Sequence, residues 1–168
     1  GKVTVHGVGL HGLKAPNRSL YMGNSGTTMR LLMGLLSGQQ FDTQLTGDES
    51  LTKRPMERVA KPLREMNAVI NTSDGTPPVD IHGAQALKPI SYQMPMASAQ
   101  VKSAIMLAGL YADGVTEVIE PAPSRDHTER MLAGFGYPVE RDGNRVRVTG
   151  GGRLTACALE VPADISSA

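Results

Sequence analysis

The chain has 168 residues, of which 17 are Lys or Arg and 16 are Asp or Glu, so its formal net charge at pH 7 is +1. Hydrophobic residues at 40% and charged residues at 20% are typical of a globular protein, and the near-neutral balance predicts neither nucleic acid nor membrane as a partner. The single cysteine excludes an internal disulfide and indicates a reducing, cytoplasmic compartment.

The first half of the chain predicts two helices and three strands. Apolar residues at helical spacing predict a helix at 27–36, and alternation predicts a strand at 41–46. A second helix is expected at 55–66, with Pro55 in its first turn. Strands follow at 68–71 and 79–82, and the turn between them is assigned to Asp74-Gly75 and Pro77-Pro78.

The second half repeats this order. The predicted elements are a strand at 88–93, a helix at 99–111, a strand at 115–119, a helix at 126–135, and strands at 139–141 and 145–148. Asp142-Gly143 is the hairpin signal between the last two. A further strand is expected at 155–161, and it contains the only cysteine, Cys157.

The repeat has a period of about 70 residues, and each copy opens with one more strand, giving βαβαββ units. Each unit has one apolar face and must pack against its siblings, so we predict an α/β (α+β) fold. Residues 1–84 form the first predicted unit and 85–152 the second. Residues 153–168 are expected to be a strand and the start of a crossover.

A glycine-rich turn leads into the first predicted helix through Gly23, Asn24, Ser25 and Gly26. Backbone N–H groups at the positive end of a helix suit a phosphate or a carboxylate. The turn matches neither a P-loop nor the dinucleotide fingerprint. A turn capped by Ser25 or Thr27 explains the same residues, so the spacing leaves both interpretations open.

Cations surround the start of the helix at 55–66, namely Lys53, Arg54 and Arg58. Because cations at a helix N-terminus oppose the dipole, an anionic ligand would explain their placement. A solvated charged turn is the alternative. The repeat puts Arg54 and Arg125 at equivalent places, so packing of the units is expected to gather such helix starts at one end of the domain.

Polar residues also open the later helices. Ser98 is a plausible N-cap, and Gln100 in the first turn could reach a ligand over the helix end. His127 is expected to be exposed or a capping partner rather than catalytic. The four histidines lack metal-ligand spacing, so no metal site is expected.

Five stretches in fixed order carry a family resemblance: GNSGTTMRLLMGLL, GDESLTKRPMERVAKPLREM, PMASAQVKSAIMLAGL, SRDHTERMLAGFG and VPADISSA. Together they resemble the 5-enolpyruvylshikimate-3-phosphate (EPSP) synthase family, in its class II branch. The resemblance implies two of the three βαβαββ units of one domain, packed around a pseudo-threefold axis. It also implies enolpyruvyl transfer from phosphoenolpyruvate to the 5-hydroxyl of shikimate 3-phosphate, within chorismate and aromatic amino acid biosynthesis.

The resemblance further implies addition–elimination chemistry without metal or organic cofactor, inhibition by glyphosate, and a monomeric full-length enzyme. It assigns phosphoenolpyruvate to Asn24, Gly26, Arg54 and Gln100, and shikimate 3-phosphate to Ser98, Ala99, Gln100 and Arg125. Ala99 replaces a Ser of class I members, so any contact there would come from its backbone.

No catalytic residue is assigned within this chain, because the family's acid–base groups fall outside the matching stretches. We therefore expect an internal, substrate-binding portion that is inactive alone. Two alternatives remain: a UDP-N-acetylglucosamine enolpyruvyl transferase, disfavoured because its reactive-loop cysteine has no counterpart, and a non-catalytic anion-binding module.

Overall fold

The computed structural model describes residues 1–163, and the same series of six elements occurs twice in it. The first series comprises β1 (Leu20–Tyr21), α1 (Gly26–Ser37), β2 (Thr43–Thr46), α2 (Glu57–Glu65), β3 (Val69–Ser73) and β4 (Thr76–His82), with a 3-10 turn, η1 (Leu51–Lys53), before α2. The second comprises β5 (Ser91–Gln93), α3 (Ala99–Gly109), β6 (Val115–Ile119), α4 (His127–Gly134), β7 (Val139–Asp142) and β8 (Arg145–Thr149). The predicted βαβαββ repeat is confirmed.

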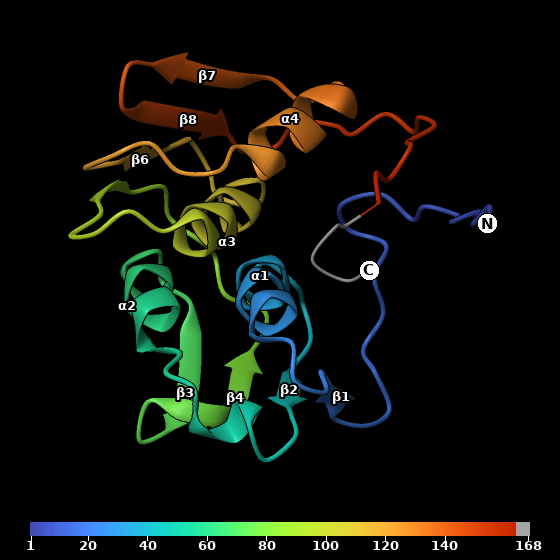
Figure 1. The fold of residues 1–168 in the computed structure, drawn as a ribbon, viewed down its shortest axis with the longest axis vertical. Coiled ribbons are helices and arrows are strands. Elements are labelled where there is room, and N and C mark those ends of the chain that lie inside the picture. The colour runs from blue at the N-terminus through green and yellow to red at the C-terminus, as the bar shows by residue number, and fades with distance from the viewer. Residues whose placement is uncertain (164–168) are drawn as a thin grey trace.

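The two sheets have the same topology. Their strand orders are β1-β2-β4-β3 and β5-β6-β8-β7, and in each the first pair is parallel and the others antiparallel. Helices α1, α2 and α3 lie between the two sheets, with α4 beside α3 and the second sheet (Figure 1). The sheets therefore form the outside of the molecule and the helices its centre.

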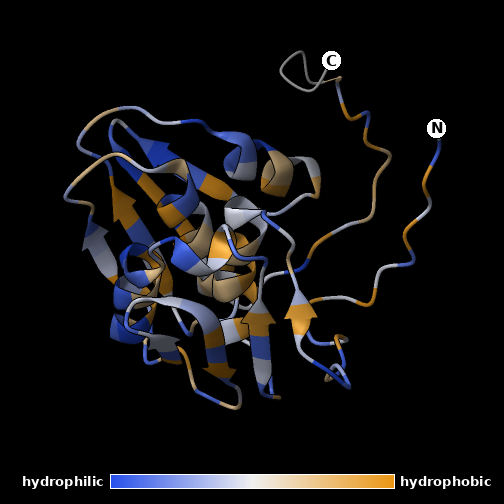
Figure 2. Cartoon of the chain, turned by 60° about the horizontal axis from the view of Figure 1, so that its bottom comes forward, coloured by the Kyte–Doolittle hydropathy of each residue, from blue (hydrophilic) through white to orange (hydrophobic). Residues whose placement is uncertain are grey.

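The core lies where the helices meet the inner faces of the sheets. Strand β4 alternates buried and more exposed residues, with Val79 and Ile81 fully buried. Met29 and Met33 of α1 are also fully buried. The strands carry alternating hydrophobic and hydrophilic residues in Figure 2, as expected when one face packs on helices and the other faces solvent.

Helices α1 and α3 touch through their backbones. A Cβ on Gly34 would stand 2.1 Å from the carbonyl oxygen of Ala104, well inside van der Waals contact. Glycine at position 34 is therefore what allows the two helices of different units to approach so closely. This contact joins the two units at the centre of the molecule.

Two predicted element boundaries are wrong near prolines. Pro77-Pro78 belongs to β4 and not to the turn, which consists of Asp74 and Gly75 with φ of 51° and 86°. Pro55 precedes α2 instead of opening it, because Met56 is the N-cap and donates its N–H to Gly75 O over 2.7 Å.

Other boundaries shift in the second unit. Strand β5 is shorter than the predicted 88–93, since Pro89 has no N–H to donate to a neighbour. Asp142 lies in β7 opposite Arg145, so the hairpin loop is Gly143-Asn144.

The strand expected at 155–161 is absent from the described structure. These residues are exposed, and no strand within residues 1–163 pairs with them. The Thr155 N–H donates to Phe135 O, which is an isolated backbone hydrogen bond. Cys157 is accordingly exposed and free. Residues 164–168, which complete the VPADISSA stretch and the expected crossover, lie outside the described residues.

Residues 1–19 run along the molecule without helix or strand. The Tyr111 hydroxyl donates to Leu10 O over 2.7 Å, and the His11 ring meets the Tyr111 ring edge-on with centroids 5.7 Å apart. Burial raises the pKa of Tyr111. Within residues 1–163, none of the helices combines the length and the apolar character that crossing a bilayer requires.

Candidate functional site

Helices α1 and α3 begin in the same way. The Ser25 hydroxyl oxygen accepts the Thr28 N–H, and the Ser98 hydroxyl oxygen accepts the Val101 N–H, both over 3.2 Å. Neither helix has an acidic residue in its first turn. Each N-terminus therefore keeps an uncompensated positive end of its dipole, which favours an anion.

Gln100 joins these two helix starts. Its Nε2 donates to Thr27 Oγ1 over 2.9 Å, and its Oε1 accepts from Arg30 Nη1 over 2.7 Å. Thr27 and Arg30 belong to α1 and Gln100 to α3, so the N-termini of the two helices lie side by side. Because both ends of the amide are engaged, the orientation of Gln100 is fixed.

Two guanidinium groups face Gly26, the first residue of α1. A Cβ at this position would stand 3.2 Å from Arg54 Nη1 and 3.3 Å from Arg30 Nη1. Arg30 Nη2 also donates to Pro55 O over 3.0 Å, which holds the α1 side chain against the segment that carries Arg54. The two cations therefore stand directly beside the bare glycine at the helix end.

These arginines form a cationic cluster of Arg30, Arg54 and Arg58. Burial, and then the positive charges of Arg54 and Arg58, lower the pKa of Arg30 below its ordinary value. Among the ion pairs within residues 1–163, none involves these three side chains. A group of like charges beside two helix N-termini is the arrangement expected for binding an anionic ligand.

The chain positions Arg54 through a short turn. Asp48 Oδ1 accepts the Leu51 N–H over 2.8 Å, and the Arg54 N–H donates to Leu51 O over 3.0 Å. The Asp48 N–H donates to Gly23 O over 2.8 Å, which ties this turn to the glycine-rich turn before α1. Asp48 therefore shapes the backbone around the site instead of neutralising its cations.

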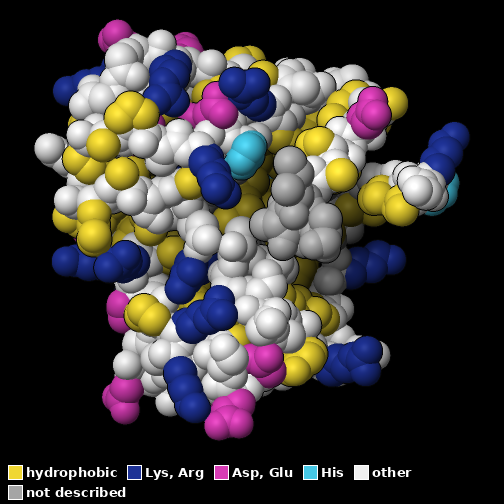
Figure 3. Space-filling view, viewed as in Figure 1, with side chains coloured by type: hydrophobic (Ala, Val, Ile, Leu, Met, Phe, Trp, Pro, Cys, Tyr) yellow, Lys and Arg dark blue, Asp and Glu magenta, His cyan; other side chains and the backbone are white. Residues whose placement is uncertain are grey.

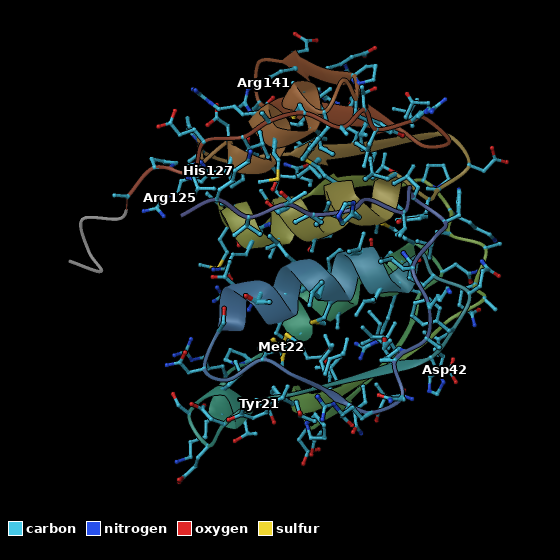
Figure 4. All side chains as sticks on the ribbon, turned by 90° about the vertical axis from the view of Figure 1, so that its right-hand side faces the viewer. Tyr21, Met22, Asp42, Arg125, His127 and Arg141 are labelled. Atoms are coloured by element: carbon cyan, nitrogen blue, oxygen red, sulfur yellow. The ribbon has the colours of Figure 1, made fainter. Side chains whose placement is uncertain are left out.

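Arg125 belongs to the segment before α4 and has no described contact with the cluster. Its side chain is exposed, and no hydrogen bond or ion pair within residues 1–163 joins it to another predicted site residue. In Figure 4, Arg125 and His127 lie at the end of the molecule where α1 begins. His127 is exposed at the start of α4, as expected.

The predicted residues are thus brought together only in part. Gly26, Arg54 and Gln100 meet around Arg30, whereas Asn24 is exposed and makes no side-chain hydrogen bond to the residues described. Ser98 lines a cavity of about 260 Å³, with Arg58, Lys61, Tyr92 and Met94 among its other walls. In Figure 3, Lys and Arg side chains gather over the middle of the face that is turned to the viewer.

Sequence reasoning missed Arg30, although it stands in the glycine-rich motif. The signal was its position one helical turn after Gly26, which places residues i and i+4 on the same helix face. Thr27 was considered only as a cap, whereas Ser25 caps the helix and Thr27 contacts Gln100. No group of His, Cys, Asp or Glu within the described residues could hold a metal ion.

Comparison with known proteins places the whole chain in one family. The family model described as EPSP synthase (3-phosphoshikimate 1-carboxyvinyltransferase) matches residues 1–168. Proteins named 3-phosphoshikimate 1-carboxyvinyltransferase from Methylococcus capsulatus and Nitrosococcus oceani are 66% and 63% identical to it over 169 residues. Each alignment covers 100% of this chain but only 39% and 38% of the relative, so the chain spans under two fifths of their length.

A solved structure has the same fold. EPSP synthase from Acinetobacter baumannii superposes with a TM-score of 0.93 at 64% identity, over 96% of this chain and 37% of that one. The arrangement of the two sheets and four helices is therefore shared with a longer member of this family.

Proposed function

The chain belongs to the EPSP synthase family, and from that membership we propose that it forms a substrate-binding portion of a 3-phosphoshikimate 1-carboxyvinyltransferase. The reaction transfers the enolpyruvyl group of phosphoenolpyruvate to the 5-hydroxyl of shikimate 3-phosphate and releases phosphate. Both substrates are anions. The observation that carries the proposal is the cationic cluster, which has no carboxylate partner within residues 1–163, beside the joined N-termini of α1 and α3.

Phosphoenolpyruvate is assigned to Asn24, Gly26, Arg54 and Gln100. The absence of a side chain at Gly26 lets an anionic group reach the backbone N–H groups at the start of α1. The planar guanidinium of Arg54 can then hold two oxygens of that group at once. Arg30 supports this contact, because it faces Gly26 and fixes the amide of Gln100.

Shikimate 3-phosphate is assigned to Ser98, Ala99, Gln100 and Arg125. Ser98 and Ala99 stand at the start of α3, where backbone N–H groups and the helix dipole favour the phosphate. Gln100 lies between the α1 and α3 starts and is thus placed to contact both substrates. Arg125 would add a charge from the segment before α4.

This chain's contribution to the chemistry is binding and orientation. Holding both anions at adjacent helix ends brings the 5-hydroxyl to the enolpyruvyl carbon, which lowers the entropic cost of the addition step. The proton transfers of the addition and elimination are assigned to groups outside this chain, so the chain alone is expected to be inactive. We propose no metal or organic cofactor.

Three further properties belong to the same proposal. Glyphosate would compete with phosphoenolpyruvate beside Gly26. The complete enzyme would act as a monomer. It would be located in the cytoplasm, because the single cysteine is expected in a reducing compartment. The names of the relatives favour this reaction over transfer to UDP-N-acetylglucosamine.

A hybrid synthase tests the proposal. In this hybrid, the present chain replaces the matching 169-residue segment of the Methylococcus capsulatus protein, to which it is 66% identical. Phosphate release from phosphoenolpyruvate and shikimate 3-phosphate is then followed at steady state. We expect turnover from the hybrid and none from the 168-residue chain alone. A folded hybrid without turnover would refute the proposal.

A further inference from the structure

Four charged side chains meet where α3, α4 and β7 come together. Lys102 of α3 is fully buried, and its Nζ lies 3.0 Å from Glu120 Oε1 and 3.2 Å from Glu129 Oε2. Arg141 of β7 reaches the same two carboxylates, with distances of 3.1 Å to Glu120 and 2.9 Å to Glu129. These four residues, the ion network, connect α3 to the end of β6, to α4 and to β7; Lys102 and the two carboxylates are buried, whereas Arg141 keeps part of its side chain in solvent.

The ion network has no formal net charge, since it holds two cations and two carboxylates. Burial alone raises the pKa of Glu120, but hydrogen bonds from Ser124 and Lys102 and the charges of Lys102 and Arg141 together bring it below its ordinary value. A buried ion pair is seldom a gain in stability over apolar packing, because both charges lose their hydration. One buried carboxylate oxygen, Glu129 Oε1, even lacks a hydrogen-bond partner within the described structure.

The network anchors the segment that carries Arg125. Glu120 opens the segment and accepts a hydrogen bond from Ser124, the neighbour of Arg125. Glu129 lies at its far end in α4, and Thr128 Oγ1 donates to Ser103 Oγ over 2.7 Å. Residues 120–129 are thus tied to α3 on both sides of Arg125.

Lys102 stands in α3 one helical turn after Ser98 and two residues after Gln100. It is therefore the link between the helix start assigned to shikimate 3-phosphate and the segment that carries Arg125. We propose that Lys102 is a positioning residue, which holds Arg125 at a fixed distance from Ser98 and Gln100. The inference rests on the proposed function and adds a specific cause for the affinity toward shikimate 3-phosphate.

The test compares KM values in the hybrid synthase. Because Lys102→Met alone leaves two buried carboxylates with one cation, the informative variant is Lys102→Met/Glu129→Gln, which keeps the network neutral. Glu129→Gln alone is the reference. Arg147→Met is the control for losing an ion pair elsewhere, since Arg147 of β8 pairs with Glu117 of β6 in the second sheet. Each of these three variants is made in two backgrounds, one that keeps Arg125 and one that carries Arg125→Ala. Thermal unfolding is recorded alongside KM and kcat.

We expect the charge-balanced variant to raise KM for shikimate 3-phosphate about tenfold over its reference, within the range of coupled neighbours. KM for phosphoenolpyruvate should stay within about twofold, and Arg147→Met should leave both unchanged. In the Arg125→Ala background the increase should vanish, because the two changes act on one contact. Ser124→Ala removes only the hydrogen bond to Glu120. It should also raise KM for shikimate 3-phosphate more than KM for phosphoenolpyruvate, by a smaller factor.

Three results would overturn the inference: an unchanged KM for shikimate 3-phosphate, an equal rise in both KM values, or the same rise with and without Arg125. A role in stability alone would lower the unfolding temperature and the active fraction without separating the two KM values. A folded but inactive unsubstituted hybrid would overturn the proposed function and this inference together. If the hybrid turns over but the two KM values do not separate in the charge-balanced variant, the inference alone is overturned.

Discussion

Nη1 of Arg54 lies 3.2 Å from the point where a Cβ on Gly26 would stand. Gly26 opens α1, and Arg54 follows a separate 3-10 turn. A methyl group at position 26 would therefore already be in contact with the Arg54 guanidinium. Any side chain at position 26 would shorten the room available to a ligand between this guanidinium and the helix.

Gly26→Ala in the hybrid synthase should weaken inhibition by glyphosate more than it weakens use of phosphoenolpyruvate. The added Cβ meets the ends of two flexible arginine side chains and not backbone, so the fold should accommodate it. Glyphosate is longer than phosphoenolpyruvate and, at the place proposed for it, would need the space that the methyl group takes. The measurement is the inhibition constant against KM for phosphoenolpyruvate. Equal changes in both would place glyphosate elsewhere.

Arg54→Ala should lower kcat/KM for phosphoenolpyruvate about 10- to 100-fold, because a hydrogen bond to a charged group contributes roughly 1.5–3 kcal/mol. The dissociation constant of shikimate 3-phosphate, measured by calorimetry, should change far less. Arg54→Lys should recover only part of the loss, since an ammonium group cannot form the paired hydrogen bonds of a guanidinium. A full rescue by lysine would reduce the role of Arg54 to a point charge.

Arg30→Met should affect both substrates. The change removes the 2.7 Å hydrogen bond that fixes the Gln100 amide, and Gln100 is placed between the two assigned ligands. We expect KM for phosphoenolpyruvate and for shikimate 3-phosphate to rise together in the hybrid synthase. Arg58→Met removes a charge of the same cluster without such a bond and is the matched control. A rise confined to one substrate would show that Arg30 acts without Gln100.

Gly34→Ala should destabilise the fold by roughly 1–3 kcal/mol, the usual cost of overpacking. The new methyl group would collide with the backbone of Ala104, which cannot turn aside as a side chain can. Gly134→Ala in α4 is the matched control, because its Cβ meets nothing within 4 Å and alanine favours a helix. Thermal unfolding of both variants checks this, and similar unfolding temperatures would argue against close contact of α1 and α3.

Glu57→Gln should make stability less dependent on pH in the acid range. Hydrogen bonding from Arg64 is the main cause that lowers the pKa of Glu57 below its ordinary 4.5 in the folded protein. This stabilisation is present above pH 4.5 and is lost as pH falls through the lower folded value. The unfolding temperature of the parent chain should therefore fall more steeply below pH 4.5 than that of the variant.

The control for this pH series is Glu65→Gln, because Glu65 forms none of the ion pairs within residues 1–163. Its curve should run parallel to that of the parent chain. Parallel curves for Glu57→Gln as well would mean that the Arg64 contact does not stabilise the folded state.

Periodicity predicted the elements well wherever packing follows local pattern. The strand at Val115–Ile119 was predicted with its observed bounds, because a short run of β-branched residues between turn signals has few alternatives. The prolines at 77 and 78 misled, since they occupy a strand. The structure tolerates them because pairing with β2 begins only at Val79 and the register with β3 shifts between Asn71 and Ser73.

Other features of the fold depend on contacts between distant residues. Nothing in the local pattern indicates that Gly34 meets Ala104, or that Lys102 is paired with Glu120 and Glu129 inside the protein. The expected strand at 155–161 failed for the same reason, because an alternating sequence becomes a strand only beside a partner.

The clustering of cations and helix starts was predictable from the sequence, but the contacts between them were not. The cations at 53–58 and the glycine-rich turn each allowed an anion site or an ordinary turn, and the repeat indicated that helix starts would gather. The bridge from Gln100 to Thr27 and Arg30 could not be read from spacing, because these residues lie on helices of different units. Arg125 stands apart in the structure, although the repeat made it equivalent to Arg54.

The hydrogen bond between Thr27 and Gln100 has an evolutionary consequence. Each is the second residue of the first helix of its unit, so the two hold equivalent places in the repeat and face each other. An ancestral single unit that paired with itself would present the same residue twice at this junction. Once the gene for such a unit is duplicated, each copy mutates alone, and a hydroxyl can face an amide. Asymmetry at the junction, which the two unlike substrates proposed above would require, is then open to selection.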